Sequence, residues 1–208
     1  MKLAFSQLER ARKNPAKFGR AFSPGGGFFN NANFRVYFFA AMRQFHEGKT
    51  KKEALQFFDD KCNDKLSHQA HFQGRLTHYK NVLADYCDTF AAQGCQFVEA
   101  AKRVSLVLGN HTLRGKIERF DIRLPAGYRA TATQLHETDW ENELRWPLLQ
   151  KAISQEYGCS TAEVEVGVFC FENGKYEYRI YTDEEIATAE AETETVLTQV
   201  EINVPPAP

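Results

Sequence analysis

The fold is set by residues 103–135, which read RVSLVLGNHTLRGKIERFDIRLPAGYRATATQL. Apolar and polar residues alternate through most of this segment, the period expected of β-strands that bury one face. Gly109-Asn110 and Pro125-Ala126-Gly127 interrupt the alternation with residues typical of turns. The segment therefore predicts three consecutive antiparallel strands: Val104–Leu108, Leu113–Leu124 and Tyr128–Leu135.

On both sides of these strands the apolar residues recur at helical spacing. The sequence predicts helices near 33–47, 50–66 and 69–93, then Glu143–Tyr157 and an acidic helix from Asp183. A short helix over 3–13 with Ser6 as its cap, and a hairpin of Val164–Glu172 with Tyr176–Thr182, complete the elements. We expect one α/β domain over 1–204, made of a basic arm (1–27), a helical part (28–102), a sheet core (103–182) and the acidic helix (183–204), followed by a tail (205–208).

The net charge of −1 conceals a strong asymmetry along the chain. Residues 1–133 contain 22 of the 26 Lys and Arg and 11 of the 27 Asp and Glu, a balance of +11, and residues 134–208 have a balance of −12. One interpretation is that the first part faces a polyanion while the second faces a protein partner. The other is that the two parts fold together and their charges partly cancel.

Three local patterns occur in a fixed order. Phe5-Ser6-Gln7-Leu8 precedes Asn14-Pro15-Ala16-Lys17-Phe18, the central strand contains Gly115-Lys116-Ile117-Glu118-Arg119-Phe120-Asp121, and the later helix contains Arg145-Trp146-Pro147-Leu148-Leu149. Their order and spacing resemble the RecB-like branch of the PD-(D/E)XK nuclease superfamily. The resemblance implies a PD-(D/E)XK core, a mixed sheet with a three-stranded antiparallel meander flanked by helices.

Members of this family cleave phosphodiesters with Mg²⁺ or Mn²⁺, held by carboxylates beside a lysine. The resemblance places the first metal-binding carboxylate at Glu118, one methylene longer than the family's aspartate. The other catalytic positions are substituted. They fall on Tyr37 for a histidine, Thr131 and Thr133 for the acidic residue and the lysine, and Arg145 and Leu149 for a glutamine and a tyrosine. The resemblance thus predicts a pseudonuclease without catalytic residues or a metal cofactor.

Relocated residues are the alternative for catalysis. Glu118, Asp121 and His136, supported by the acidic run up to Glu143, could together bind Mg²⁺ or Mn²⁺. The competing interpretation is that this run is solvated ahead of a helix. His46 beside Glu47 could likewise join Glu118 as a ligand, although a single histidine at a helix end is more often a capping or surface group.

The basic arm is the predicted nucleic-acid surface. Its cations alternate with Phe5, Phe18 and Phe22, a combination suited to phosphate contact and base stacking. The cations of the arm predicted to contact DNA are Arg10, Arg12, Lys13, Lys17 and Arg20. The other interpretation is that these phenylalanines belong to the core and the cations are only solvated.

The sequence thus favours a DNA-binding or scaffolding subunit of a nucleic-acid processing, repair or defence complex, with weak DNA binding and a protein partner. Two alternatives are an active Mg²⁺-dependent nuclease and a protein-interaction domain without nucleic acid. The chain has no apolar run long enough to cross a membrane, and its first residues lack an apolar signal segment. We therefore expect no membrane association and a cytoplasmic location.

Overall fold

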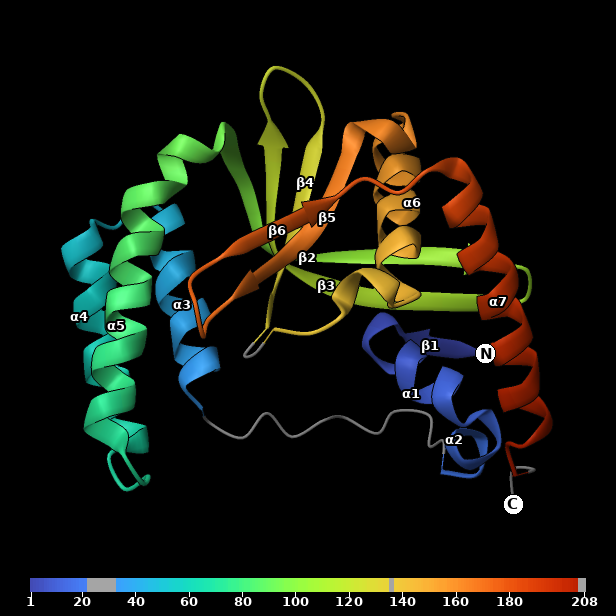
Figure 1. Cartoon of the computed structure of the whole chain (residues 1–208), viewed down its shortest axis with the longest axis horizontal. Helices are drawn as coiled ribbons and strands as arrows, with labels where there is room; N and C mark the ends of the chain where they lie inside the picture. Colours follow the sequence, from blue (N-terminus) through green and yellow to red (C-terminus); the bar gives the residue numbers. More distant parts are fainter. Residues whose placement is uncertain (22–32, 135–136, 206–208) are drawn as a thin grey trace.

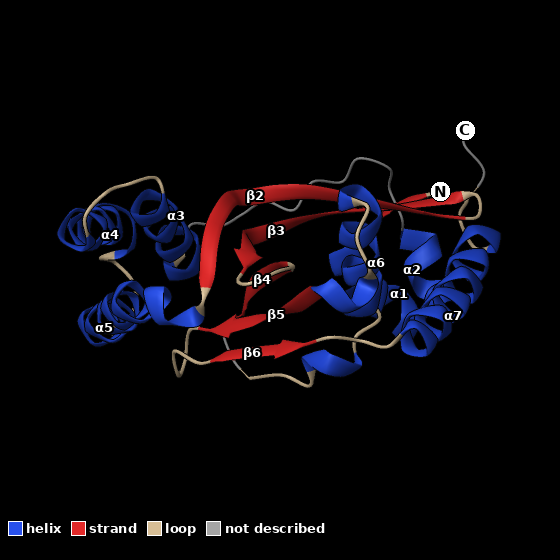
Figure 2. Cartoon of the chain, turned by 90° about the horizontal axis from the view of Figure 1, so that it is seen from above, coloured by secondary structure: helices blue, strands red, loops and turns tan. Residues whose placement is uncertain are grey.

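The computed structural model describes residues 1–21, 33–134 and 137–205. Six strands form one mixed sheet, with helices on two sides of it (Figure 1, Figure 2). The strands are β1 (Lys2–Ala4), β2 (Cys95–Leu108), β3 (His111–Arg123), β4 (Tyr128–Gln134), β5 (Val164–Cys170) and β6 (Tyr176–Arg179). The predicted α/β class, a mixed sheet flanked by helices, is confirmed.

The long strand β3 is the centre of the sheet. It pairs antiparallel with β2 on one side, while on the other it pairs parallel with β1 over 112–114 and antiparallel with β4 over 119–122. Strand β5 then adds parallel to β4, and β6 antiparallel to β5. Because β1 and β4 leave β3 in different directions, residues 115–118 of β3 lie at a fork between them (Figure 1).

Two groups of helices flank the sheet (Figure 2). On one side lie α3 (Phe34–His46), α4 (Lys51–Leu66) and α5 (Phe72–Thr89). On the other side lie α1 (Leu8–Lys13), α2 (Pro15–Ala21), α6 (Arg145–Tyr157) and α7 (Asp183–Ile202). Thr50 and Thr182 cap α4 and α7 with their side chains, which explains where these two helices begin.

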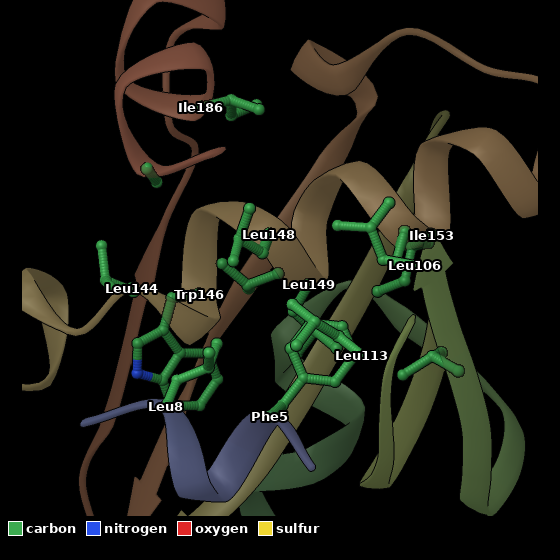
Figure 3. Close-up of a cluster of buried hydrophobic side chains, with 14 of the residues drawn as sticks. Phe5, Leu8, Leu106, Leu113, Leu144, Trp146, Leu148, Leu149, Ile153 and Ile186 are labelled. Carbon is green, nitrogen blue, oxygen red and sulfur yellow. The ribbon is translucent and has the colours of Figure 1, made fainter. Parts of the chain in front are cut away.

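Each group of helices has its own apolar core against the sheet. The first core joins Phe5 and Leu8 of the N-terminal segment to the strands and to Trp146 and Leu149 of α6 (Figure 3). The second core packs Phe38 of α3 and other residues of α3–α5 against Phe169 of β5 and Phe171, which directly follows this strand. Burying both faces in this way explains why β5 is apolar along nearly its whole length.

Three expectations about local structure are wrong. Residues 2–4 form strand β1, and Gln7 rather than Ser6 precedes α1. Within the predicted basic arm, residues 1–21 pack onto the fold, because Leu3, Phe5, Leu8 and Ala11 are buried in the first core. The helical part ends before residue 102, since β2 already begins at Cys95.

The charge asymmetry is partly balanced inside the molecule. The guanidinium of Arg12 lies 2.6 Å from the carboxylate of Glu192 on α7, and the N-terminal ammonium lies 2.8 Å from that of Glu201. Arg129 of β4 likewise pairs with Glu165 of β5. Carboxylates of the acidic part therefore neutralise some cations of the basic part, including Arg12 of the set predicted to contact DNA.

Candidate functional site

A cleft lies at the fork of the sheet, where β1 and β4 diverge from β3. It has a volume of about 950 Å³ and is lined by the N-terminal segment, α3, β2, β3, β4 and α6. Five of its lining residues are cations: Arg35, Arg103, Arg114, Lys116 and Arg145. Its acidic lining residues are Glu118 and Glu156. The cleft is therefore a basic cavity with one carboxylate at the fork itself.

Glu118 is held by two partners at this fork. One carboxylate oxygen accepts a hydrogen bond from the Arg35 guanidinium at 2.9 Å, and the other accepts from the backbone N–H of Thr133 at 3.3 Å. Arg35 also donates to the Thr133 hydroxyl at 3.2 Å. Both carboxylate oxygens of Glu118 therefore already have partners within the protein.

The local sequence explains how Arg35 reaches this position. Asn33 caps α3 by accepting a hydrogen bond from the N–H of Val36 at 3.1 Å, so the helix begins beside the fork. Arg35 and Phe39 are four residues apart and lie on one face of α3. Phe39, which is half-buried, lies under the ammonium of Lys116, 5.8 Å from the ring centroid.

The described residues do not fit a divalent metal site beside Glu118. Asp121, the second carboxylate proposed for such a site, is fully buried and lies 2.8 Å from the guanidinium of Arg119. Within the described ranges no group of three His, Cys, Asp or Glu side chains is arranged to bind a metal. His136, the third ligand of that alternative, lies outside the described residues. A metal shared by Glu118 and Asp121 therefore stays a prediction, and the ion pair of Asp121 with Arg119 argues against it.

The predicted catalytic positions divide into two groups. Glu118, Arg145 and Leu149 all line the cleft, and Thr133 contacts Glu118 directly. Thr131 instead belongs to a buried network in which its hydroxyl accepts from Arg119 at 3.4 Å. Tyr37 packs against the second core. Four of the six positions that the family resemblance assigns to catalysis therefore lie in or beside the cleft.

The buried network behind the fork is centred on Arg119, which is 1% exposed. Its guanidinium donates to Asp121 and to the hydroxyls of Tyr86 and Tyr178, and thereby joins α5, β3 and β6. Burial raises the pKa of Asp121 although Arg119 opposes this shift. Most of these polar groups find partners within the network, which indicates a structural role, although Oδ1 of Asp121 is buried without a hydrogen bond among the described residues.

His46, considered as a metal ligand, is held in an apolar setting. Its ring stacks on Phe97 with centroids 4.4 Å apart and shares a hydrogen bond with the Tyr86 hydroxyl. Burial, with a smaller contribution from Arg119, lowers the pKa of His46 to about 3. It is therefore neither a ligand beside Glu118 nor a surface group.

Of the cations predicted to contact DNA, Arg12 is engaged in several polar contacts: besides its ion pair with Glu192 it donates to the carbonyl of Asn142 at 3.0 Å. Arg10 lies over the ring of Phe18. Lys13, Lys17 and Arg20 are exposed on α1 and α2. None of the five lines the cleft.

Sequence reasoning missed three of the five cations of the cleft: Arg35, Arg103 and Arg114. Arg103 and Lys116 are directly opposite each other in the β2–β3 ladder, and Ser105 is opposite Arg114. The sequence contains a signal for this pairing, since a two-residue turn at Gly109-Asn110 fixes the register of the hairpin. Arg35 offers no such signal, because its position depends on how α3 packs on the sheet.

The comparisons with known proteins agree with this architecture. No family model matches the chain, and no curated protein matches its sequence. Among solved structures the chain is similar to a protein named "Putative exonuclease" from Eubacterium rectale, with a TM-score of 0.52 and 9% identity over 86% of this chain and 71% of that one. The two share a fold. A second structure, named SSO0001, has a TM-score of 0.35 and 9% identity over 93% of this chain and 86% of that one.

At such low identity the likeness concerns the fold alone. It places the chain beside a nuclease-like structure without fixing an activity. No helix in the described part of the chain combines the length and apolar character needed to cross a membrane.

Proposed function

We propose that the protein binds DNA in the basic cleft and does not cleave it. The observation that carries the proposal is the ion pair between Arg35 and Glu118 at the fork. Hydrolysis by a PD-(D/E)XK site needs carboxylates that are free to hold a metal ion. Here the carboxylate at that position is already neutralised by a cation, while the surrounding cleft attracts phosphate.

The antiparallel order of β2, β3 and β4 supports assignment of the sheet to a PD-(D/E)XK core. The fork at Glu118 and the approach of Arg145 and Leu149 to it support the alignment with the RecB-like branch. In this assignment the protein is a degenerate member that acts as a DNA-binding or scaffolding subunit of a larger complex. We place its main DNA contacts in the cleft, with Lys13, Lys17 and Arg20 as a second, weaker surface.

Charge substitutions at the fork test the proposal. Because Glu118 repels phosphate and competes for Arg35, Glu118→Gln should strengthen binding of a labelled oligonucleotide several-fold, whereas Arg35→Ala should weaken it. Fluorescence anisotropy at about 50 mM salt, where attraction between charges is weakly screened, measures both. Glu47→Gln, which removes one exposed carboxylate at the far end of α3, is the matched control and should leave the affinity unchanged.

The proposal fails if wild-type protein does not bind the oligonucleotide even at this salt concentration. In that case a protein-interaction domain becomes the better interpretation of the basic surface.

Isothermal titration with Mn²⁺ gives an independent check of the absence of a metal site. A single carboxylate supplies too few oxygen ligands for a site tighter than about millimolar, so a micromolar site on the wild-type protein would instead support the nuclease alternative.

A further inference from the structure

The cleft continues onto the solvent-facing side of the β2–β3 ribbon. Side chains of paired residues in an antiparallel ladder lie on the same face, and alternate residues share that face. Arg103, Ser105, Arg114 and Lys116 are therefore neighbours on one face, and all four are exposed. The opposite face carries Val104, Leu106 and Leu113, which are buried in the first core. The ribbon thus has one apolar face and one basic face.

The basic face is unfavourable for the folded protein by itself. Arg103 and Lys116 are directly opposite each other, and like charges in this arrangement destabilise a sheet. Among the described residues, no carboxylate forms an ion pair with Arg103, Arg114 or Lys116, although ion pairs are numerous elsewhere. An anionic ligand would relieve this repulsion.

The spacing of these cations matches an extended chain of phosphates. Successive residues on one face of a strand lie about 6.6 Å apart, close to the separation of neighbouring phosphates along an extended nucleic-acid strand. The pair Arg103 and Lys116 provides one phosphate position, and Arg114 provides the next toward the turn at 109–110. Ser105, opposite Arg114, adds a hydroxyl that can donate a hydrogen bond.

An aromatic ring lies beside these cations of the β2–β3 ribbon. Phe39 of α3 is half-buried and contacts the ammonium of Lys116. Nucleic-acid sites for single strands combine a cationic groove with aromatic rings on which bases stack. A base whose phosphate is bound by Arg103 and Lys116 would find this ring on the α3 side of the cleft.

From these observations we propose that the cleft binds a single strand, extended along the basic face of β2–β3 from Glu118 toward the turn at 109–110. The proposal rests on the proposed function and specifies its ligand and path. The size of the cavity, about 950 Å³, supports it. Such a volume is at the upper end of small-ligand pockets and accommodates a few nucleotides, but it cannot enclose a duplex.

The experiment compares two variants that each lose three positive charges. The first variant changes three cations of the ribbon to Ala: Arg103, Arg114 and Lys116. The control variant changes three exposed lysines in and just before α4 to Ala: Lys49, Lys52 and Lys61. Binding of an oligodeoxythymidine of about 12 nucleotides is measured by anisotropy at several salt concentrations, after thermal melting has shown that both variants fold. Each lost contact to a single strand flattens the log–log salt dependence by about 0.7.

We expect the first variant to flatten the slope by about 2 and the control to leave it unchanged. A blunt duplex should bind the wild-type protein at least about tenfold more weakly than the single strand. Phe39→Leu should weaken single-strand binding about 5- to 150-fold, the equivalent of ~1–3 kcal/mol per stacked base, and Phe39→Tyr should retain it.

The path of the strand is tested separately by cross-linking. A photoreactive group on Ser105→Cys should cross-link the oligonucleotide, whereas the same group on Gln56→Cys, exposed on α4, should not. If the wild-type protein binds DNA but the two triple variants behave alike, or the duplex binds as well as the single strand, the inference is overturned while the proposed function stands. Equal competition by polyglutamate also overturns it, because phosphate spacing would then play no part. If the wild-type protein binds no DNA at all, both the inference and the proposed function are overturned.

Discussion

At the scale of single residues, close approach explains why Gly115 occurs in the central strand. A Cβ atom built on this residue would lie 2.7 Å from Cδ2 of Phe5, which is buried against β3. A glycine in a strand often marks such a contact. The same contact positions Phe5 and Ser6 at the rim of the cleft.

Gly115→Val should therefore lower the stability of the fold. Larger side chains in a packed core force neighbouring groups to move and typically cost about 1–3 kcal/mol, which chemical denaturation would measure. Gly74→Ala is the control, because no atom lies near its Cβ position in α5 and alanine is favoured over glycine in a helix by about 1 kcal/mol. An unchanged midpoint for Gly115→Val would mean that Phe5 does not pack against β3.

At the scale of elements, regular periods made the helices predictable. The predicted spans near 33–47 and 50–66 agree with α3 and α4 to within a residue or two. The first half of β2 was missed because its alternation is broken by a register shift between Phe97 and Glu99 and by Ala101, whose φ is 61°. Strand β1 is only three residues long and depends on β3 for its pairing.

The candidate site was also predictable only in part, because some of its contacts depend on how distant elements pack together. Glu118 and Thr133 follow from motif and strand order, and the cations of β2 and β3 follow once the hairpin register is known. The ion pair of Glu118 with Arg35 joins residues 83 positions apart on different elements. Contacts of this kind arise from the packing of α3 on the sheet, which no local pattern encodes.

The packing of α3 against α5 and β2 should make stability depend on pH through His46. Its pKa is about 3 in the folded protein, below the ordinary histidine value of 6.5. Between these values the unfolded chain binds more protons, so stability is complete above pH 6.5 and falls as the pH decreases. At pH 5 the loss amounts to about 2 kcal/mol.

Denaturation of the wild-type protein and of His46→Phe, each at pH 7.5 and pH 5, isolates this contribution. The variant keeps an aromatic ring against Phe97 but binds no proton. The wild-type protein should therefore lose about 2 kcal/mol more than the variant on acidification. Equal losses would show that His46 is protonated freely in the folded state.

At the scale of the whole molecule, the fold separates an internally balanced side from a basic one. Acidic residues of α7 pair with Arg12, Lys151 and the N-terminal ammonium. The cations of the β2–β3 ribbon have no such partners among the described residues, and they border the fork where Glu118 is paired with Arg35. The cations that we propose to bind phosphate therefore lie beside the ion pair at the fork.

The central claim is that the protein binds DNA without cleaving it. One incubation in which both binding and cleavage are measured tests this claim most directly. A DNA oligonucleotide labelled at one end is mixed with saturating protein and Mn²⁺, its binding is measured by anisotropy, and its length is then determined on a denaturing gel. We predict that the DNA is bound and remains full-length after hours. Shortened products that disappear in the Glu118→Ala variant would contradict the account.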